Sequence, residues 1–187
     1  MRKRGIFYWI FRGKTRFSVG WGPAISARVQ SERYNPHPMR ITRRLEFDAG
    51  HRIPNHGSQC RHLHGHRYAI EITLTGPLIA TSGAADEGMV MDFSELKAIA
   101  QKHIVEPWDH AFLAWRQDHA VVEFLGTIPG HKTVLFDAPP TAEYLAETAF
   151  RILDPLYRSR YGAKLELQQV RLYETPNCWA DAVRGDA

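Results

Sequence analysis

The stretch RYAIEITLTG, residues 67–76, alternates between apolar and polar side chains along most of its length. Its large apolar residues all fall on one face of an extended chain: Tyr68, Ile70, Ile72 and Leu74. A period of two is typical of a β-strand with one buried side and one solvent-facing side. The segment therefore commits the chain to a sheet that is covered on one face.

Three other segments are predicted to be strands. Residues 41–49 (ITRRLEFDA) and 165–175 (LELQQVRLYET) are rich in strand-forming residues. The short apolar run 89–93 (MVMDF) can return to the sheet after a loop. Tight links between such segments favour antiparallel pairing.

Two helices are predicted from their capping signals. Asp92 and Glu95 have the spacing of a capping box, and an apolar stripe follows them. This helix should end before Pro107, because the residue that precedes a proline is disfavoured in a helix. Thr141 is a good N-cap for the second helix, which Pro155 should end or kink.

This order of elements predicts an α+β fold, with an antiparallel four-stranded sheet and two helices packed on one face. The apolar fraction of 44% is ordinary for a soluble globular domain, and 187 residues fit one domain with an appendage. Two cysteines, Cys60 and Cys178, are too few for a disulfide framework, so a reducing cytoplasm is the expected location. Cys178 is given no role.

The net charge of +4 comes from the start of the chain. Residues 1–38 hold eight Lys or Arg and one acidic residue, whereas residues 39–187 hold 16 Lys or Arg and 19 acidic residues. An acidic body does not favour a nucleic-acid binder. The apolar run 6–11 is too short to span a bilayer. We expect residues 1–38 to be a poorly ordered leader or a mis-annotated start, and residues 39–187 to be the functional domain.

Five of the ten histidines lie between residues 51 and 66. His64 and His66 are two residues apart, so they project to the same side of an extended strand. His51, at the end of the preceding strand, can reach the same point across a hairpin. Three imidazoles with a fourth position open are typical of catalytic zinc. We therefore predict a zinc site formed by His51, His64 and His66.

Two neighbours of these histidines leave alternatives open. His62 is also two residues from His64 and is the rival ligand. Cys60 can be a fourth ligand, which would make the site closed and structural. It can instead be an acid, base or nucleophile beside an open site, because a nearby dication favours the thiolate form of a cysteine.

The pattern FDAGHRIP, Cys60, LHGH resembles the 6-pyruvoyl-tetrahydropterin synthase and 6-carboxy-tetrahydropterin synthase family. Four further segments match that family in the same order: GMVMDFSELK, WDHAFL, PTAEYLAE and VRLYET. Together the matches cover residues 41 to about 183. Trp108 stands where the family usually has leucine, and the segment 114–139 is longer than the family's usual link to its second helix.

The resemblance implies a role for each matching residue. The family's zinc ligands correspond to the three histidines named above, and its catalytic cysteine to Cys60. Its Asp-His pair, a second acid/base, corresponds to Asp109 and His110. The glutamate that anchors the pterin ring corresponds to Glu174, and Thr141, explained as a helix cap, is a second candidate contact to substrate.

The family's fold is the tunnelling fold (T-fold), in which subunits join their sheets into a barrel. The resemblance therefore implies a homo-oligomer, commonly a hexamer, with active sites between subunits. The acidic body and the short apolar run lead us to expect no nucleic-acid or membrane partner. The family's substrate is a dihydropterin triphosphate, 7,8-dihydroneopterin triphosphate.

The expected function is that of a zinc-dependent 6-carboxy-5,6,7,8-tetrahydropterin synthase, a carbon–carbon lyase that releases acetaldehyde and triphosphate on the path to queuosine. The alternative within the family is 6-pyruvoyl-tetrahydropterin synthase, which eliminates triphosphate and shares the motif residues. A non-catalytic zinc-binding module, with Cys60 as the fourth ligand, is the alternative from another class.

Overall fold

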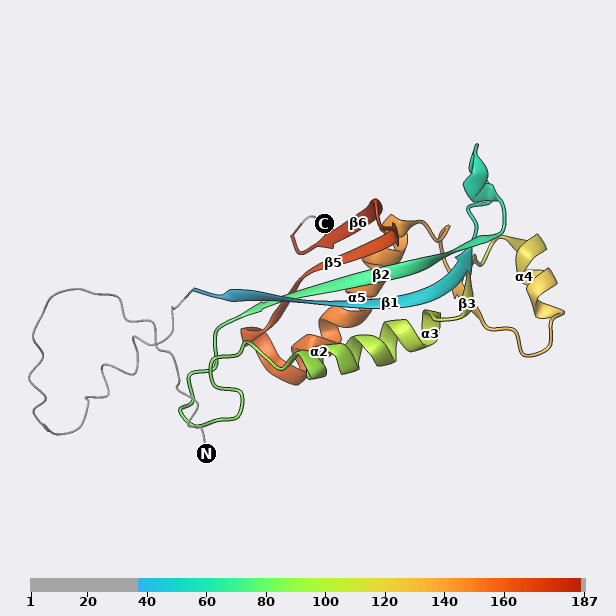
Figure 1. Ribbon diagram of the computed structural model, residues 1–187. Helices are drawn as coiled ribbons and strands as arrows, with labels where there is room; N and C mark the ends of the chain where they lie inside the picture. Colours follow the sequence, from blue (N-terminus) through green and yellow to red (C-terminus); the bar gives the residue numbers. More distant parts are fainter. Residues whose placement is uncertain (1–36, 186–187) are drawn as a thin grey trace, which may run out of the picture. The chain divides into compact units, whose positions relative to one another are not determined.

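The computed structural model describes residues 37–185, so the expectation about the leader falls almost entirely outside the described residues. Six strands form one mixed sheet in the order β4-β3-β1-β2-β5-β6. Their bounds are β1 Met39–His51, β2 His64–Gly76, β3 Ala111–Trp115, β4 Thr133–Phe136, β5 Glu166–Thr175 and β6 Cys178–Val183. Figure 1 shows β1 and β2 as the two long central strands.

The helices lie between the strands in the chain. The first helical stretch consists of α2, a π-helical turn η2 and α3, and the two other α-helices are α4 and α5. Their bounds are α2 Phe93–Ala100, η2 Gln101–Val105, α3 Glu106–Trp108, α4 His119–Gly126 and α5 Ala142–Tyr161, with short 3-10 turns η1 Gln59–Arg61 and η3 Gly162–Lys164. None of the described helices is both long enough and apolar enough to cross a bilayer.

The predicted sheet is correct in part. Strands β1, β2 and β5 lie in predicted segments and pair antiparallel, whereas β6, which pairs antiparallel with β5, was not predicted. Strands β3 and β4, also not predicted, run parallel to β1. The prediction of a purely antiparallel, four-stranded sheet is therefore wrong in number and in kind. The two parallel strands have five and four residues, which is too short for an alternating pattern to identify them.

Residues 89–93 do not form a strand, which contradicts the prediction. Val90 and Met91 are buried in the core, so the run is apolar because it packs beneath the sheet rather than because it pairs. Two backbone hydrogen bonds, from Ile79 N to Met89 O and from Gly88 N to Ile79 O, close the preceding loop instead.

Helices α2 and α5 lie along the same face of the sheet, as Figure 1 shows. The apolar face predicted for β2 is fully buried against them, from Tyr68 to Leu74. Each such side chain contributes about 1.5–3 kcal/mol when it leaves water. The buried Tyr157 of α5 donates a hydrogen bond of 3.0 Å to Leu96 O of α2, which fixes the two helices to each other.

The predicted helix starts are confirmed, whereas neither Pro107 nor Pro155 ends its helix. Asp92 accepts a hydrogen bond from Ser94 N, and Thr141 accepts one from Tyr144 N. The first helical stretch, however, runs through Pro107, which lies in the first turn of α3 after the π-helical turn. Helix α5 continues past Pro155 to Tyr161, because core packing on both sides of the proline outweighs the lost backbone hydrogen bond.

Candidate metal centre and active site

Three histidine side chains, the histidine triad, meet where the β1–β2 hairpin opens. His51 and His64 are direct partners in the strand register, and His66 lies opposite Ala49. The three ring centroids are 4.5, 4.9 and 5.1 Å apart, and one ligand nitrogen from each ring lies within 4.8 Å of the others. One metal ion can therefore be shared by all three with small side-chain rotations.

Hydrogen bonds hold two of these rings in one tautomer. His51 Nδ1 donates to Pro140 O at 2.9 Å, and His64 Nδ1 donates to His62 O at 2.8 Å. The Nε2 atoms are left as free acceptors, which is the usual arrangement of a metal-binding histidine. His51 Nε2 is also buried without a hydrogen-bond partner among the described residues. A buried nitrogen lone pair of this kind fits a bound cation.

Burial favours the neutral form of two rings of the triad, His51 and His66. It lowers the pKa of His51 to about 4, although the hydrogen bond to Pro140 opposes it, and the charges of His64 and His66 lower it further. Burial, followed by the charge of His64, also lowers the pKa of His66. Neutral imidazole is the form that binds metal, so the lowered pKa values of His51 and His66 favour metal binding by these two residues.

This burial predicts a pH dependence for the metal-free protein. Unfolded His51 takes up a proton near pH 6.5, whereas the folded residue does so only near 4. Between these values the unfolded state binds more protons, so the free energy of unfolding falls as the pH falls. We expect His51 to account for a loss of roughly 3 kcal/mol between pH 7 and pH 4.

Urea unfolding of the chelated protein at several pH values measures this loss. His51→Gln should remove most of the slope between pH 6.5 and 4, and His56→Ala, which alters an exposed histidine of the neighbouring loop, should keep it. Equal slopes in the two variants would contradict the assignment of the slope to His51.

Cys60 lies beside the triad. It is partly buried and lines a cavity of about 530 Å³ with Gln59, His62, His64 and His66. Ile53 N donates to Cys60 O at 2.8 Å, which closes the loop between β1 and β2. Within the described residues, the group of side chains that could hold a metal contains the three predicted histidines and neither Cys60 nor the rival ligand His62.

Glu174, at the end of β5, also faces the triad. Its Oε1 lies 3.8 Å from His51 Nε2, and its side chain is mostly buried. Burial, and then the charge of Glu143, raises the pKa of Glu174. Thr141 lies next to Pro140, whose carbonyl holds His51, but its hydroxyl caps α5. The structure thus brings the triad, Cys60 and Glu174 to one end of the sheet.

Asp109 and His110, the dyad, form a separate unit at the start of β3. Asp109 Oδ2 lies 2.9 Å from His110 Nδ1, and Asp109 Oδ1 accepts a hydrogen bond of 2.9 Å from Asp48 N. His110 N donates to Asp48 O, and His110 has a left-handed φ of 55°. The Asp48 N–H, followed by His110, lowers the pKa of Asp109. An ionised Asp109 therefore orients the imidazole of His110.

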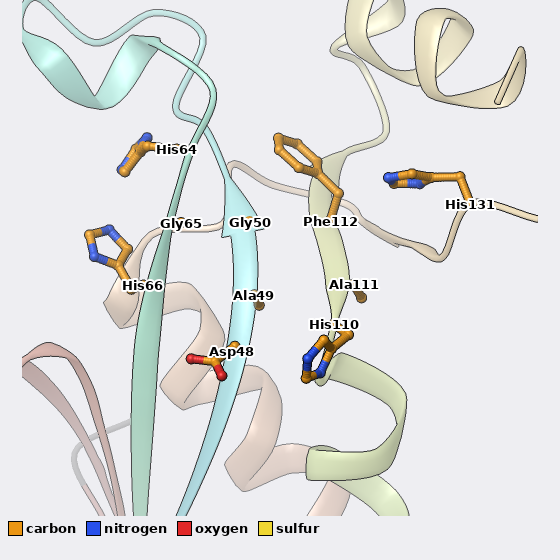
Figure 2. Close-up of a pocket in the computed structure, with 10 residues that line it drawn as sticks. All are labelled: Asp48, Ala49, Gly50, His64, Gly65, His66, His110, Ala111, Phe112 and His131. Carbon is orange, nitrogen blue, oxygen red and sulfur yellow. The ribbon is translucent and has the colours of Figure 1, made fainter.

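His110 of the dyad lines a different hollow from the cavity that Cys60 lines. This hollow has a volume of about 600 Å³ and is lined by Asp48, Ala49, Gly50, His64, Gly65, His66, His110, Ala111, Phe112 and His131. Figure 2 shows His64 and His66 on β2, whereas His110 lies at the start of β3, with β1 between these strands. A side chain at Gly50 would collide with Phe112, since a Cβ there would lie 2.8 Å from its ring. In one chain, His110 does not line the cavity of Cys60.

Sequence reasoning missed two supports of the site, both from the long segment 114–139. Lys132 Nζ donates to Glu106 O at 2.6 Å and to Asp109 O at 2.7 Å, so it braces the turn that carries the dyad. Arg52, next to His51, makes two hydrogen bonds of 2.5 and 2.6 Å with the buried carboxylate of Asp118. A single lysine or aspartate in an irregular segment gives no signal of such a role.

Comparisons with known proteins find relatives that match most of the described residues. A sequence model of the family described as 6-pyruvoyl tetrahydropterin synthase matches residues 40–184. The chain is 36% identical over 144 residues to the 6-carboxy-5,6,7,8-tetrahydropterin synthase of Rickettsia bellii, a match that covers 76% of this chain and 99% of the relative. It is 30% identical over 145 residues to the enzyme of the same name from Haemophilus influenzae, over 76% of this chain and 97% of the relative.

Solved structures share the fold at lower identity. The 6-pyruvoyl tetrahydropterin synthase of Caenorhabditis elegans superposes with a TM-score of 0.54 at 23% identity, over 79% of this chain and 96% of that chain. An uncharacterized protein from Wolinella succinogenes superposes with a TM-score of 0.58 at 23% identity, over 79% and 99% of the two chains.

Proposed function

Because the chain belongs to the 6-pyruvoyl tetrahydropterin synthase family, we propose that it is a zinc-dependent 6-carboxy-5,6,7,8-tetrahydropterin synthase. The proposed reaction converts 7,8-dihydroneopterin triphosphate and one water molecule to 6-carboxytetrahydropterin, acetaldehyde and triphosphate, as a step towards queuosine in the cytoplasm. The observation that carries the proposal is the histidine triad together with Cys60. Cys60 lines the same cavity as His64 and His66 but does not belong to the group of possible metal ligands. The names of the relatives from Rickettsia and Haemophilus favour the carboxy product.

In this proposal His51, His64 and His66 hold the zinc ion. Zinc supplies a Lewis acid that makes the side-chain hydroxyls of the substrate more acidic. Cys60 acts as the acid/base that moves a proton between the side chain and the ring carbon of the substrate. Its position in the same cavity as His64 and His66 supports this role.

The dyad is the proposed second acid/base. Asp109 holds the imidazole of His110 by its Nδ1, which leaves Nε2 to exchange a proton with substrate. His110 is 78% exposed, and the hollow that it lines reaches His64 and His66 but not Cys60. We therefore propose a homo-oligomer, of the hexameric kind common in the family, in which His110 of one subunit serves the substrate at the triad of another.

Glu174 is the proposed anchor of the pterin ring, because a carboxylate can accept hydrogen bonds from the amino group and the ring N–H together. Thr141 is a second proposed contact. Glu174→Gln should raise KM about 10- to 100-fold and leave the bound metal in place, because an amide offers one acceptor and an unwanted donor. Steady-state kinetics and metal analysis measure both effects.

Glu166→Gln, at the far end of the same strand, is the control and should leave KM unchanged. An unaltered KM in Glu174→Gln would remove the anchor role. Loss of metal from that variant would make Glu174 a ligand instead, since its carboxylate lies close to His51 Nε2.

Incubation of the zinc-loaded protein with 7,8-dihydroneopterin triphosphate, followed by mass analysis, tests the proposed reaction. Release of acetaldehyde supports the carboxy synthase. Release of triphosphate without acetaldehyde would support 6-pyruvoyl-tetrahydropterin synthase. Zinc binding without any product would support a non-catalytic zinc-binding module, which the position of Cys60 outside the ligand cluster disfavours.

A further inference from the structure

Tyr68 packs against two residues of the histidine triad, His51 and His66. It follows His66 by two residues on β2, so both side chains lie on the same face of the strand. Its ring centroid lies 5.8 Å from that of His51 and 5.5 Å from that of His66, and the ring stacks on Phe47 at 5.2 Å. The side chain has no exposed surface.

The hydroxyl of Tyr68 is buried and has no hydrogen-bond partner among the described residues. Tyr157 is equally buried, but its hydroxyl donates to Leu96 O at 3.0 Å. Three buried side-chain atoms of the described residues lack a partner, and two of them, His51 Nε2 and Tyr68 OH, belong to residues whose rings are in contact. A buried polar atom without a partner is costly, so this pair points to a ligand.

The groups around the hydroxyl identify the kind of partner. A tyrosine hydroxyl keeps its proton at neutral pH and can therefore donate a hydrogen bond. Because Tyr68 packs against His51 and His66, an oxygen atom of a molecule bound at the triad is a suitable acceptor.

We propose that Tyr68 is a substrate-binding residue, and that its hydroxyl donates a hydrogen bond to an oxygen of the ligand held at the histidine triad. The identity of that ligand rests on the proposed function, in which the oxygen is a side-chain hydroxyl of the dihydropterin. The hydroxyl of Tyr68 destabilises the empty protein and gains its hydrogen bond only when the ligand is bound. A tyrosine with a purely structural role would instead stabilise the empty protein and would not affect ligand binding.

Tyr68→Phe and Tyr157→Phe are a matched pair of variants that test the proposal. Tyr68→Phe should keep its bound zinc and melt at the same temperature as the wild type or higher in the absence of substrate, whereas kcat/KM should fall about tenfold or more. Tyr157→Phe should lose the hydrogen bond to Leu96 O that is present in the wild type. Its melting temperature should therefore fall by about 2–4 °C, with kcat/KM unchanged.

A Tyr68→Phe variant that melts below the wild type, as Tyr157→Phe does, would show that the hydroxyl has a structural partner and would overturn the proposal. An unchanged kcat/KM in Tyr68→Phe would also overturn it. Failure of the wild type to turn over 7,8-dihydroneopterin triphosphate would overturn the proposed function instead. The melting temperatures would then still decide whether the hydroxyl of Tyr68 is unpaired in the substrate-free protein.

Discussion

Cys60→Ala is expected to abolish turnover while the protein keeps its full complement of metal. A positioned acid/base contributes about 10²- to 10⁴-fold to a rate, and alanine leaves no group that can carry the proton. The metal should stay, because the cluster of possible ligands contains three histidines and not Cys60. Turnover of 7,8-dihydroneopterin triphosphate and the zinc content per chain measure the two effects.

Cys178→Ala is the matched control, because this second cysteine is exposed and lies on β6 at the sheet edge. It should leave both rate and metal content unchanged. If zinc leaves together with the thiol of Cys60, the site is a closed one of three histidines and a cysteine, and the catalytic reading of Cys60 is wrong.

His66→Ala is expected to lose the metal, and turnover with it. Removal of an outer partner of a metal ligand usually costs 10–100-fold in affinity, and removal of a ligand itself should cost more. Equilibrium dialysis against zinc measures the affinity, and addition of excess zinc should restore little of the activity because a binding group is missing.

His62→Ala is the control for this variant. The carbonyl of His62 accepts the hydrogen bond from His64, and alanine keeps that carbonyl, so zinc affinity should be retained. The reverse result, with metal lost from His62→Ala and kept by His66→Ala, would show that the rival ligand is the true one.

The parts of the fold and site that were predictable depend on local spacing. Alternation along β2 identified its buried face, and the separation of two residues between His64 and His66 placed both rings on one side of the strand. Asp92 and Thr141 were recognisable as caps because a cap is satisfied within one helical turn.

The parts that were not predictable depend on distant partners. Pro107 and Pro155 lie inside helical stretches, because tertiary packing outweighs the local preference of proline. Strand β3 exists because β1 and β4 flank it. Tyr68 has the pattern of an ordinary core residue, and only the missing partner of its hydroxyl sets it apart.

A stretch of four residues in β1, residues 48–51, contributes to both the dyad and the histidine triad. The backbone of Asp48 holds Asp109 and His110, and His51 belongs to the triad. A slip of β1 by one residue would turn His51 to the opposite face and displace the anchor of the dyad by about 3.3 Å in the same movement. The register of β1 with its neighbouring strands therefore determines the positions of the metal ligands and of the proton-transfer pair at the same time.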